Sequence, residues 1–290
     1  MFRPAALLSV NINNSDNCVF VGACAFINTI GPFANINFTN SGNFLTFGPA
    51  AGSIVTITDL GGRITVNNSG DLATAGAGVA GISAVTSLGG KINITNTGDI
   101  ATAGLSSYGI YAQASGPGDI TVANAGRIAT AGVYATGIRA VAAGLSNDVN
   151  IQNNGEIATI GFAADGIFSL TASRNSNVNI GNTGDVTTRG HYAYGIRAVT
   201  FDRNSNITIT NSGTFNTSGI NAEGIFPLTY DRNADISVAN TGEINTRGRD
   251  AEGLHLTTFG PASSINVNNS GSVTTRALRR KASAPEAACA

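Results

Sequence analysis

Apolar and polar residues alternate along this chain in short blocks that return every 28 or 29 residues. In each block an apolar residue stands six and four positions before a glycine, and polar residues fill the odd positions between them. An alternation with a period of two predicts a β-strand with one dry face and one wet face. The glycines that mark the blocks are Gly42, Gly70, Gly98, Gly126, Gly155, Gly184, Gly213, Gly242 and Gly271.

Two further strands are predicted in each repeat. An apolar residue stands two positions after the marking glycine and a threonine four positions after it, so both share the inward parity. A recurring Gly-Ile pair, such as Gly109-Ile110, begins the third strand. Glycine at these turns is expected to supply a positive φ or a tight corner that a Cβ would obstruct.

Three short strands per repeat and no helical period predict an all-β fold, a right-handed parallel β-helix (β-solenoid) of about ten coils with three strands per coil. A repeat of this length cannot bury its apolar face alone and must stack on its neighbours. The inner faces of the three sheets then cover one another, and the right hand follows the rule for parallel crossovers. A propeller blade needs four strands and about 40 residues, so the period excludes it.

The repeat pattern assigns residues 10–276 to the β-helix, after a non-repeat start at 1–9 that we interpret as the remnant of an export signal. Residues 277–290 are expected to form a disordered or aberrant tail, and the chain is interpreted as a piece of a longer protein. The period changes from 28 to 29 between Gly126 and Gly155. We expect the turn at Gly144, Leu145, Ser146 and Asn147 to absorb the added residue.

An asparagine stands two positions before each marking glycine, again with inward parity. Stacked asparagine amides can hydrogen-bond from coil to coil, as in other parallel stacks, so we expect a buried structural ladder. Its members are Asn40, Asn68, Asn96, Asn124, Asn153, Asn182, Asn211, Asn240 and Asn269. The threonine row shares this parity, and we expect it to face inward or to lie at a corner.

Composition narrows the possible partners. The 290 residues include 37 glycines and no tryptophan, 11% are charged, and the net charge is -1. No basic patch indicates a nucleic-acid partner, and no ligand spacing indicates a metal or another cofactor. Cys18 and Cys24 either form a disulfide in an oxidising compartment or leave Cys18 as a small buried hydrophobe.

The repeat resembles the passenger domains of bacterial autotransporters (type V secretion), which carry runs like Asn-Thr-Gly-Asp-Ile-Ala-Thr-Ala-Gly followed by Tyr-Gly-Ile-Tyr-Ala, residues 96 to 112 here. The resemblance covers about residues 10 to 276. It implies a surface-displayed or shed β-helix, associated with the outer membrane or extracellular, that acts as an adhesin or display rod. It also implies a host-surface or matrix glycan or protein as partner, and export by an outer-membrane β-barrel translocator that we expect outside this chain.

The alternative function is that of a polysaccharide-active β-helix enzyme, a lyase or glycoside hydrolase. Glu223 and Glu252 occupy one outward position on successive coils, so their exposed carboxylates could lie within about 5 Å of each other, with Asp165 two coils earlier. Glycoside hydrolysis uses two carboxylates about 5 to 9 Å apart. Acids also occur on any solvated face, so we expect no enzymatic activity. The same edge carries Tyr194, His191, Arg197, Arg249, Asp250 and His255.

Two other surface features carry chemistry. Arg174, Arg203 and Arg232 align in a turn of successive coils, beside Asp202 and Asp231, and we favour a role in turn geometry and solubility over an anionic-ligand site. Outward aromatic residues could stack on sugar rings or on partner chains. They are Tyr111, Phe168 and Phe226, with Tyr108 and Tyr194 nearby.

Overall fold

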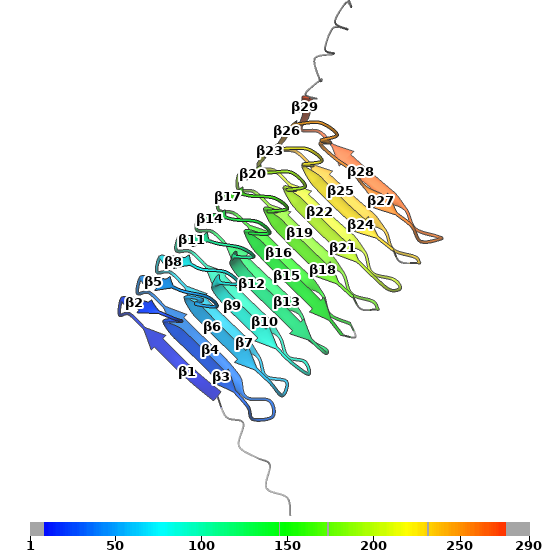
Figure 1. Ribbon diagram of the computed structural model, residues 1–290. Helices are drawn as coiled ribbons and strands as arrows, with labels where there is room; N and C mark the ends of the chain where they lie inside the picture. Colours follow the sequence, from blue (N-terminus) through cyan, green and yellow to red (C-terminus); the bar gives the residue numbers. More distant parts are fainter. Residues whose placement is uncertain (1–8, 145, 173, 231, 277–290) are drawn as a thin grey trace, which may run out of the picture.

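The computed structural model describes residues 9–144, 146–172, 174–230 and 232–276, which form an elongated stack of coils built from β-strands (Figure 1). The strands belong to three parallel sheets that run the length of the stack. Within each sheet, every strand pairs with the strand three places away in the chain, so one coil contributes one strand to each sheet. The predicted fold, a right-handed parallel β-helix with three strands per coil, is confirmed.

The first and second sheets contain ten strands each and the third contains nine. The first sheet comprises β1 (Ser9–Asn14), β4 (Asn35–Asn40), β7 (Ile64–Asn68), β10 (Ile92–Asn96), β13 (Ile120–Asn124), β16 (Val149–Asn153), β19 (Val178–Asn182), β22 (Ile207–Asn211), β25 (Ile236–Asn240) and β28 (Ile265–Asn269). The second comprises β2 (Cys18–Val21), β5 (Phe44–Phe47), β8 (Leu72–Ala75), β11 (Ile100–Ala103), β14 (Ile128–Ala131), β17 (Ile157–Ile160), β20 (Val186–Arg189), β23 (Thr214–Ser218), β26 (Glu243–Arg247) and β29 (Ser272–Arg276). The third comprises β3 (Ala25–Thr29), β6 (Ile54–Thr58), β9 (Ala80–Thr86), β12 (Tyr108–Ser115), β15 (Ile138–Ala143), β18 (Ile167–Thr171), β21 (Ile196–Thr200), β24 (Ile225–Thr229) and β27 (Thr257–Thr258).

The change of period from 28 to 29 falls in the turn between β15 and β16. Ser115 of β12 pairs with Ala143, and Ile120 of β13 pairs with Val149, so this turn is one residue longer than its predecessor. The strands on both sides keep their register. The predicted site of the added residue is therefore confirmed, although Leu145 itself lies outside the described residues.

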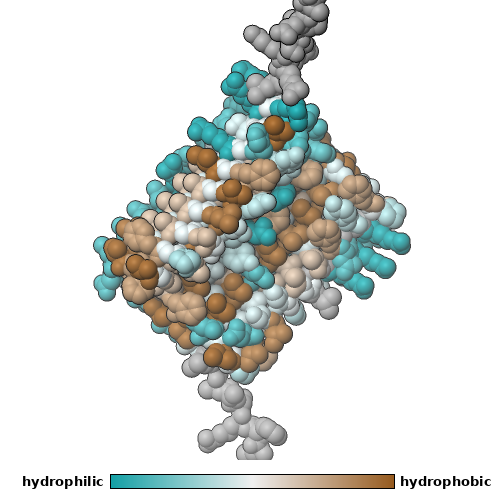
Figure 2. All heavy atoms as spheres, viewed as in Figure 1, coloured by the Kyte–Doolittle hydropathy of each residue, from teal (hydrophilic) through white to brown (hydrophobic). Residues whose placement is uncertain are grey.

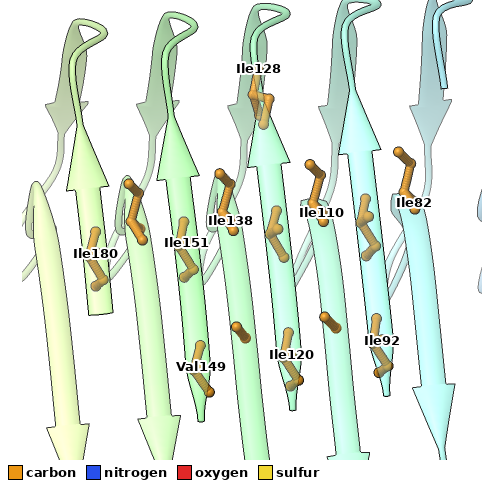
Figure 3. Close-up of a cluster of buried hydrophobic side chains, with 14 of the residues drawn as sticks. Ile82, Ile92, Ile110, Ile120, Ile128, Ile138, Val149, Ile151 and Ile180 are labelled. Atoms are coloured by element: carbon orange, nitrogen blue, oxygen red, sulfur yellow. The ribbon is translucent and has the colours of Figure 1, made fainter. Parts of the chain in front are cut away.

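Aliphatic side chains from all three sheets fill the interior in columns that run along the stack. Ile82, Ile110 and Ile138 of the third sheet lie beside Ile92 and Ile120 of the first (Figure 3). All five side chains are 0% exposed. Because each column repeats apolar residues, each coil buries its apolar face against a similar neighbour, which explains why a single repeat is not a folding unit.

Close packing, rather than an unusual φ, explains the glycine of the Gly-Ile pairs. A Cβ on Gly166 would lie 2.4 Å from Val186 Cγ1 and 2.6 Å from the carbonyl oxygen of Gly195. The marking glycines are restricted in the same way, since a Cβ on Gly98 would lie 2.1 Å from the carbonyl oxygen of Gly70. By contrast, Gly132 and most of its equivalents between the second and third sheets, although not Gly76 or Gly190, have positive φ, 143° at Gly132, where glycine is favoured.

The asparagine row lies inside the corner between the first and second sheets. Each side-chain nitrogen donates to the side-chain oxygen of the next asparagine, for example Asn124 to Asn153 at 2.9 Å and Asn153 to Asn182 at 2.8 Å. The same nitrogen also donates to the glycine carbonyl two residues ahead, as from Asn153 to Gly155 at 2.8 Å. These hydrogen bonds between side-chain amides continue without a break from Asn14 to Asn269. Both donors of an interior asparagine are thus satisfied without water.

The threonine row is buried as well. Thr130, Thr159 and Thr188 donate to the alanine carbonyl five residues ahead, at 2.7, 2.6 and 3.0 Å. These bonds close the corner between the second and third sheets. The threonine row therefore stabilises the fold. Its members, from Thr46 in the second coil to Thr246, are buried and do not present their hydroxyl groups to solvent.

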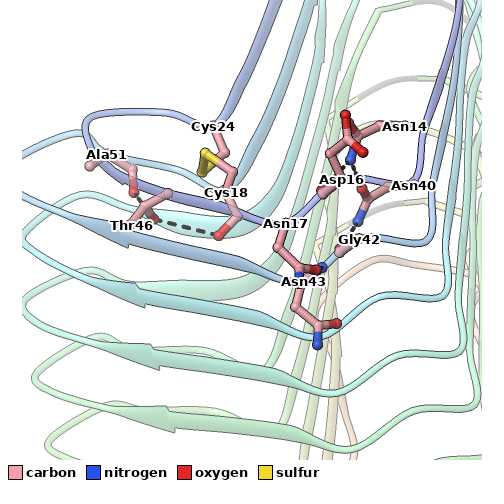
Figure 4. The surroundings of a disulfide bond; sticks show 11 residues. Asn14, Asp16, Asn17, Cys18, Cys24, Asn40, Gly42, Asn43, Thr46 and Ala51 are labelled. Atoms are coloured by element: carbon pink, nitrogen blue, oxygen red, sulfur yellow. Dashed lines mark hydrogen bonds between the residues drawn. A yellow bond between two sulfur atoms is a disulfide. The ribbon is translucent and has the colours of Figure 1, made fainter.

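The first coil carries a disulfide between Cys18 and Cys24 (Figure 4). Of the two alternatives for Cys18, the structure thus contains the disulfide. In the same coil Asn14 begins the amide ladder by donating to Asn40 and to the carbonyl of Asp16, both at 2.8 Å. An irregular coil with aspartate in place of the marking glycine therefore keeps the ladder intact.

Parts of the predicted domain organisation cannot be compared with the structure. Residues 1–8 of the non-repeat start and the tail at 277–290 lie outside the described residues. Within the part of the chain that is described, no helix is long and apolar enough to cross a membrane.

Candidate functional site

Two outward columns on the third sheet bring the titratable residues together. The first, which we call the acid column, lies in the turn that enters each third-sheet strand and includes Asp165, Tyr194, Glu223 and Glu252. The second, which we call the arginine–aromatic column, lies three residues further along each strand. Its successive members are Tyr111, Arg139, Phe168, Arg197 and Phe226.

Asp165 lies beneath the arginine–aromatic column. Its side chain is 0% exposed, and its Oδ2 lies 2.9 Å from Arg197 Nη2. The backbone N–H of Tyr194 donates to its Oδ1 at 3.0 Å. Burial raises the pKa of Asp165 to about 6, against the opposing effect of the Arg197 guanidinium.

Glu223 is the second buried acid, so the prediction of an exposed carboxylate is wrong at this position. The residue is only 6% exposed, and its Oε1 lies 3.0 Å from His255 Nδ1. Burial raises the pKa of Glu223, the His255 side chain lowers it, and the Glu252 carboxylate raises it further. Glu252 matches the prediction, because its side chain is 58% exposed; its Oε2 lies 3.7 Å from the same His255 nitrogen.

Arginine and aromatic side chains form the layer over these acids. The guanidinium carbons of Arg139 and Arg197 lie 4.4 and 4.5 Å from the ring centroid of Phe168, which is therefore held between two cations. Phe168 is 7% exposed for this reason, although it faces outward as predicted. Further along, the Tyr194 and Phe226 rings stack at 5.2 Å.

Asp165 is paired with the Arg197 guanidinium and Glu223 with the His255 imidazole, so neither of these two acids is presented to solvent. Asp165 and Glu223 are two coils apart, or about 10 Å along the stack, and Tyr194 lies in the coil between them. In this conformation the carboxyl group of Asp165 offers no accessible atom to a polysaccharide. Burial, followed by the Glu223 carboxylate, raises the pKa of the intervening Tyr194 to about 12, so that phenol stays protonated at neutral pH.

A row of exposed apolar side chains lies next to the acid column, at the corner between the second and third sheets. We call it the corner ridge. Tyr134, Phe162 and Tyr192 are 50, 43 and 43% exposed, and their rings contact one another with centroids 6.0 and 5.5 Å apart. Leu105 and Ile160, each 54% exposed, extend the ridge.

Sequence reasoning overlooked the ridge and Arg139, although a positional signal existed for both. Arg139 follows Tyr111 by one period, and the ridge residues other than Ile160 come one or two positions after the second glycine of their coils. The predicted arginine ladder is partly present: Arg174 Nε lies 3.3 Å from Asp202 Oδ2. Asp231, its other predicted acid, lies outside the described residues.

Over the described ranges, no group of three or more histidine, cysteine, aspartate or glutamate side chains could hold a metal ion. The outward chemistry is therefore that of a surface formed by rings, guanidinium groups and buried carboxylates. Comparison with known proteins adds no family to this description, because no protein-family model, no curated protein and no solved structure matches the chain.

Proposed function

We propose that this chain is a passenger β-helix of the autotransporter type, exported to the bacterial cell surface or released from it. There it acts as an adhesin or display rod and contacts a host-surface or matrix glycan or protein. The resemblance of the repeats to such passengers supports the location and the export route. The corner ridge is the observation that carries the binding role.

The ridge has the composition of an interaction surface. Contiguous exposed apolar side chains on a soluble protein mark sites of association, and tyrosine and phenylalanine are enriched at protein interfaces. The contacts of Phe162 with Tyr134 and Tyr192 restrain all three rings before any partner arrives. A partner that docks on restrained rings loses less side-chain entropy than one that must order them.

The scaffold keeps this surface rigid. Parallel strands about 4.8 Å apart place ten successive strands over roughly 45 Å, and the buried asparagine ladder links every coil to the next. The ridge therefore keeps a fixed spacing along the rod. Such a surface suits a repetitive partner, such as a glycan chain or an extended matrix protein.

The test is a triple substitution of the ridge, Tyr134→Ser, Phe162→Ser and Tyr192→Ser, assayed for binding to immobilised extracellular matrix and to a glycan array. We expect binding to fall at least tenfold, with thermal stability nearly unchanged because the three side chains are exposed. The control substitutes three apolar residues of another corner that are even more exposed, Ile30, Phe33 and Leu88, by serine. Equal binding by the two triple variants would refute the assignment to the ridge.

The alternative function, cleavage of a polysaccharide, is favoured by one observation. Burial raises the pKa of Asp165 to about 6 and also raises the pKa of Glu223, and a raised carboxyl pKa is a property of general acids. The test is release of new chain ends from a panel of polysaccharides by the parent chain and by Glu223→Gln. Cleavage by the parent that disappears in the variant would replace the adhesin proposal by the enzymatic one.

A further inference from the structure

The outer face of the second sheet changes its chemistry halfway along the rod. One outward column reads Val21, Phe47, Ala75, Ala103, Ala131 and Ile160, and then Arg189, Ser218, Arg247 and Arg276. The neighbouring outward column changes in the same coils, from alanines to Thr187, Asn216, Asn245 and Thr274. Figure 2 shows hydrophobic side chains gathered near the first coils, around β2, and hydrophilic ones at the opposite end, near β26 and β29.

The three arginines of this column lie in a setting that costs stability. Arg247 and Arg276 face each other on adjacent strands, and like charges directly opposite on a sheet are destabilising. Within the described residues, none of the three forms an ion pair with a carboxylate. Other basic residues do so, for example Lys91 with Asp119 at 2.8 Å and Arg174 with Asp202 at 3.3 Å. An exposed, unpaired column of guanidinium groups therefore has no structural explanation in the fold.

Two hollows flank the arginine column. A hollow of about 440 Å³ is lined by Arg189, Arg247 and Arg276 and by hydroxyl and amide side chains of the neighbouring column. One carboxylate, Glu243, also lines this hollow and accepts a hydrogen bond from the side-chain nitrogen of Asn245 at 2.9 Å. A second hollow of about 590 Å³ lies on the corner side, where Phe162 and His191 lie beside Arg189 and Arg247. The guanidinium groups thus stand along a groove that follows the axis of the rod.

We propose that this groove binds a linear anionic polysaccharide, whose sulfate or carboxylate groups pair with Arg189, Arg247 and Arg276. Planar guanidinium groups bind oxyanions through two parallel hydrogen bonds. The groups recur at one or two coil spacings along a straight line, which fits a polymer with regularly repeated charges. The inference rests on the arginine column and not on the display of the rod; the groove shares only Ile160 and Phe162 with the corner ridge.

The remaining lining favours a sugar polymer over a nucleic acid. The side-chain nitrogen of Asn245 donates a hydrogen bond to the side-chain oxygen of Asn216 at 3.2 Å. Thr187 and Thr274 add hydroxyl groups beside these two amides. Amides and hydroxyls can both donate and accept, as sugar hydroxyls require. Single-stranded nucleic acid is bound by successive aromatic rings on which its bases stack. The hollow that all three arginines line contains no aromatic side chain, and the second hollow contributes only the rings of Phe162 and His191.

The experiment measures binding of the purified chain to dextran sulfate, polygalacturonate, neutral dextran and single-stranded DNA at two salt concentrations. We expect binding to one or both anionic polysaccharides, weakening steeply with salt, and none to neutral dextran. Binding of only one of the two identifies the anion as sulfate or as carboxylate. Tighter binding of DNA than of either polysaccharide, or binding of no anionic polymer at low salt, would overturn the proposal.

Matched triple variants localise the site. Arg189→Ser, Arg247→Ser and Arg276→Ser together should raise the Kd at least tenfold and flatten its salt dependence. The control, Arg174→Ser, Arg203→Ser and Arg232→Ser, removes the same charge from another corner of the same coils and should change the Kd less than twofold. Equal losses in both triples would show that net charge, rather than the groove, determines binding.

A single substitution, Arg247→Gln, provides a milder test with little risk to folding. Its Kd should rise severalfold at unchanged or slightly higher melting temperature, because it relieves the repulsion with Arg276. An unchanged Kd in this variant, with the fold retained, would count against the groove. Because Phe162 borders one hollow of the groove, the two proposals are separated with the double variant Tyr134→Ser and Tyr192→Ser, whose residues line neither hollow. This variant should bind dextran sulfate normally while losing the binding assigned to the ridge, so the failure of one proposal is distinguishable from that of the other.

Discussion

Replacing Asn153 by leucine tests whether the buried amide ladder holds the coils together. The substitution removes three hydrogen bonds: those with Asn124 at 2.9 Å, with Asn182 at 2.8 Å and with the Gly155 carbonyl at 2.8 Å. One donor on Asn124 and acceptors on Asn182 and Gly155 are then left without these partners in an interior site. The surrounding ladder is 0 to 1% exposed, so water cannot replace them.

The magnitude follows from these three groups. Each buried polar group left unsatisfied costs about 1 to 3 kcal/mol, or about 3 to 9 kcal/mol in total. The buried leucine side chain returns about 2 kcal/mol of apolar burial. The free energy of unfolding should therefore fall by about 1 to 7 kcal/mol, with about 4 kcal/mol as the central value.

The assay combines urea unfolding with amide hydrogen exchange, because repeat arrays can lose cooperativity and unfold in parts. Protection should decrease most in the coils that contain Asn124 and Asn182. Two controls separate the ladder from general effects. Gln152→Leu changes the exposed neighbour on the same strand, and Asn269→Leu changes an exposed end of the ladder; each should cost less than about 1 kcal/mol. A stability of Asn153→Leu within about 0.5 kcal/mol of the parent would refute the reasoning.

Three further outcomes are expected. Gly195→Ala should destabilise the array by several kcal/mol in thermal melts, because the new Cβ would lie 2.4 Å from the Gly224 carbonyl oxygen and 2.5 Å from Phe215 Cδ1. Cys18→Ser should lower protection from hydrogen exchange only in the first coils, by about 2 kcal/mol for so short a loop. The raised pKa of Asp165 means that the folded state binds this proton more tightly than the unfolded state does. The free energy of unfolding should therefore decrease as the pH rises from about 4 to about 6. Asp165→Asn should flatten that part of the pH profile.

The sequence determines the interior of this protein almost completely, because interior positions repeat. Every coil after the irregular first one places an apolar residue, an asparagine and a threonine at fixed offsets from its marking glycine. Strand register, the sheet to which each strand belongs and the turn that absorbs the residue between Ala143 and Val149 all follow from those offsets. Parallel stacking allows no second register that keeps the isoleucine columns and the amide ladder aligned together.

The candidate site could not be predicted as well, because outward positions do not repeat. The alternation of inward and outward positions predicts that the Glu223 side chain points away from the core. It does not predict that neighbouring side chains cover this outward carboxylate. Whether an outward acid is exposed depends on which residues lean over it from the next coil. For Asp165 the covering group is Arg197, one coil later in the adjacent column. Such burial requires side-chain coordinates, because it depends on rotamers rather than on periodicity.

The arginine groove belongs to a third class of feature, which is visible in the sequence only once the columns are aligned. Arg189, Arg247 and Arg276 all stand five residues after a marking glycine, and the same offset holds Ala75, Ala103 and Ala131 in earlier coils. The arginines and the alanines are compatible with the same interior, because the side chain at this offset faces outward and does not pack in the core.

This separation of interior and exterior has a consequence for how binding surfaces arise on such a rod. Substitutions at exposed outward positions leave the amide ladder, the threonine row and the isoleucine columns untouched, so they change stability by only about 0.5 kcal/mol each. A cationic groove, an aromatic ridge and an apolar face can therefore occupy different sheets or different coils without competing for stability. The rod requires a continuous interior, whereas its surface chemistry can change from one coil to the next, as it does between Ile160 and Arg189.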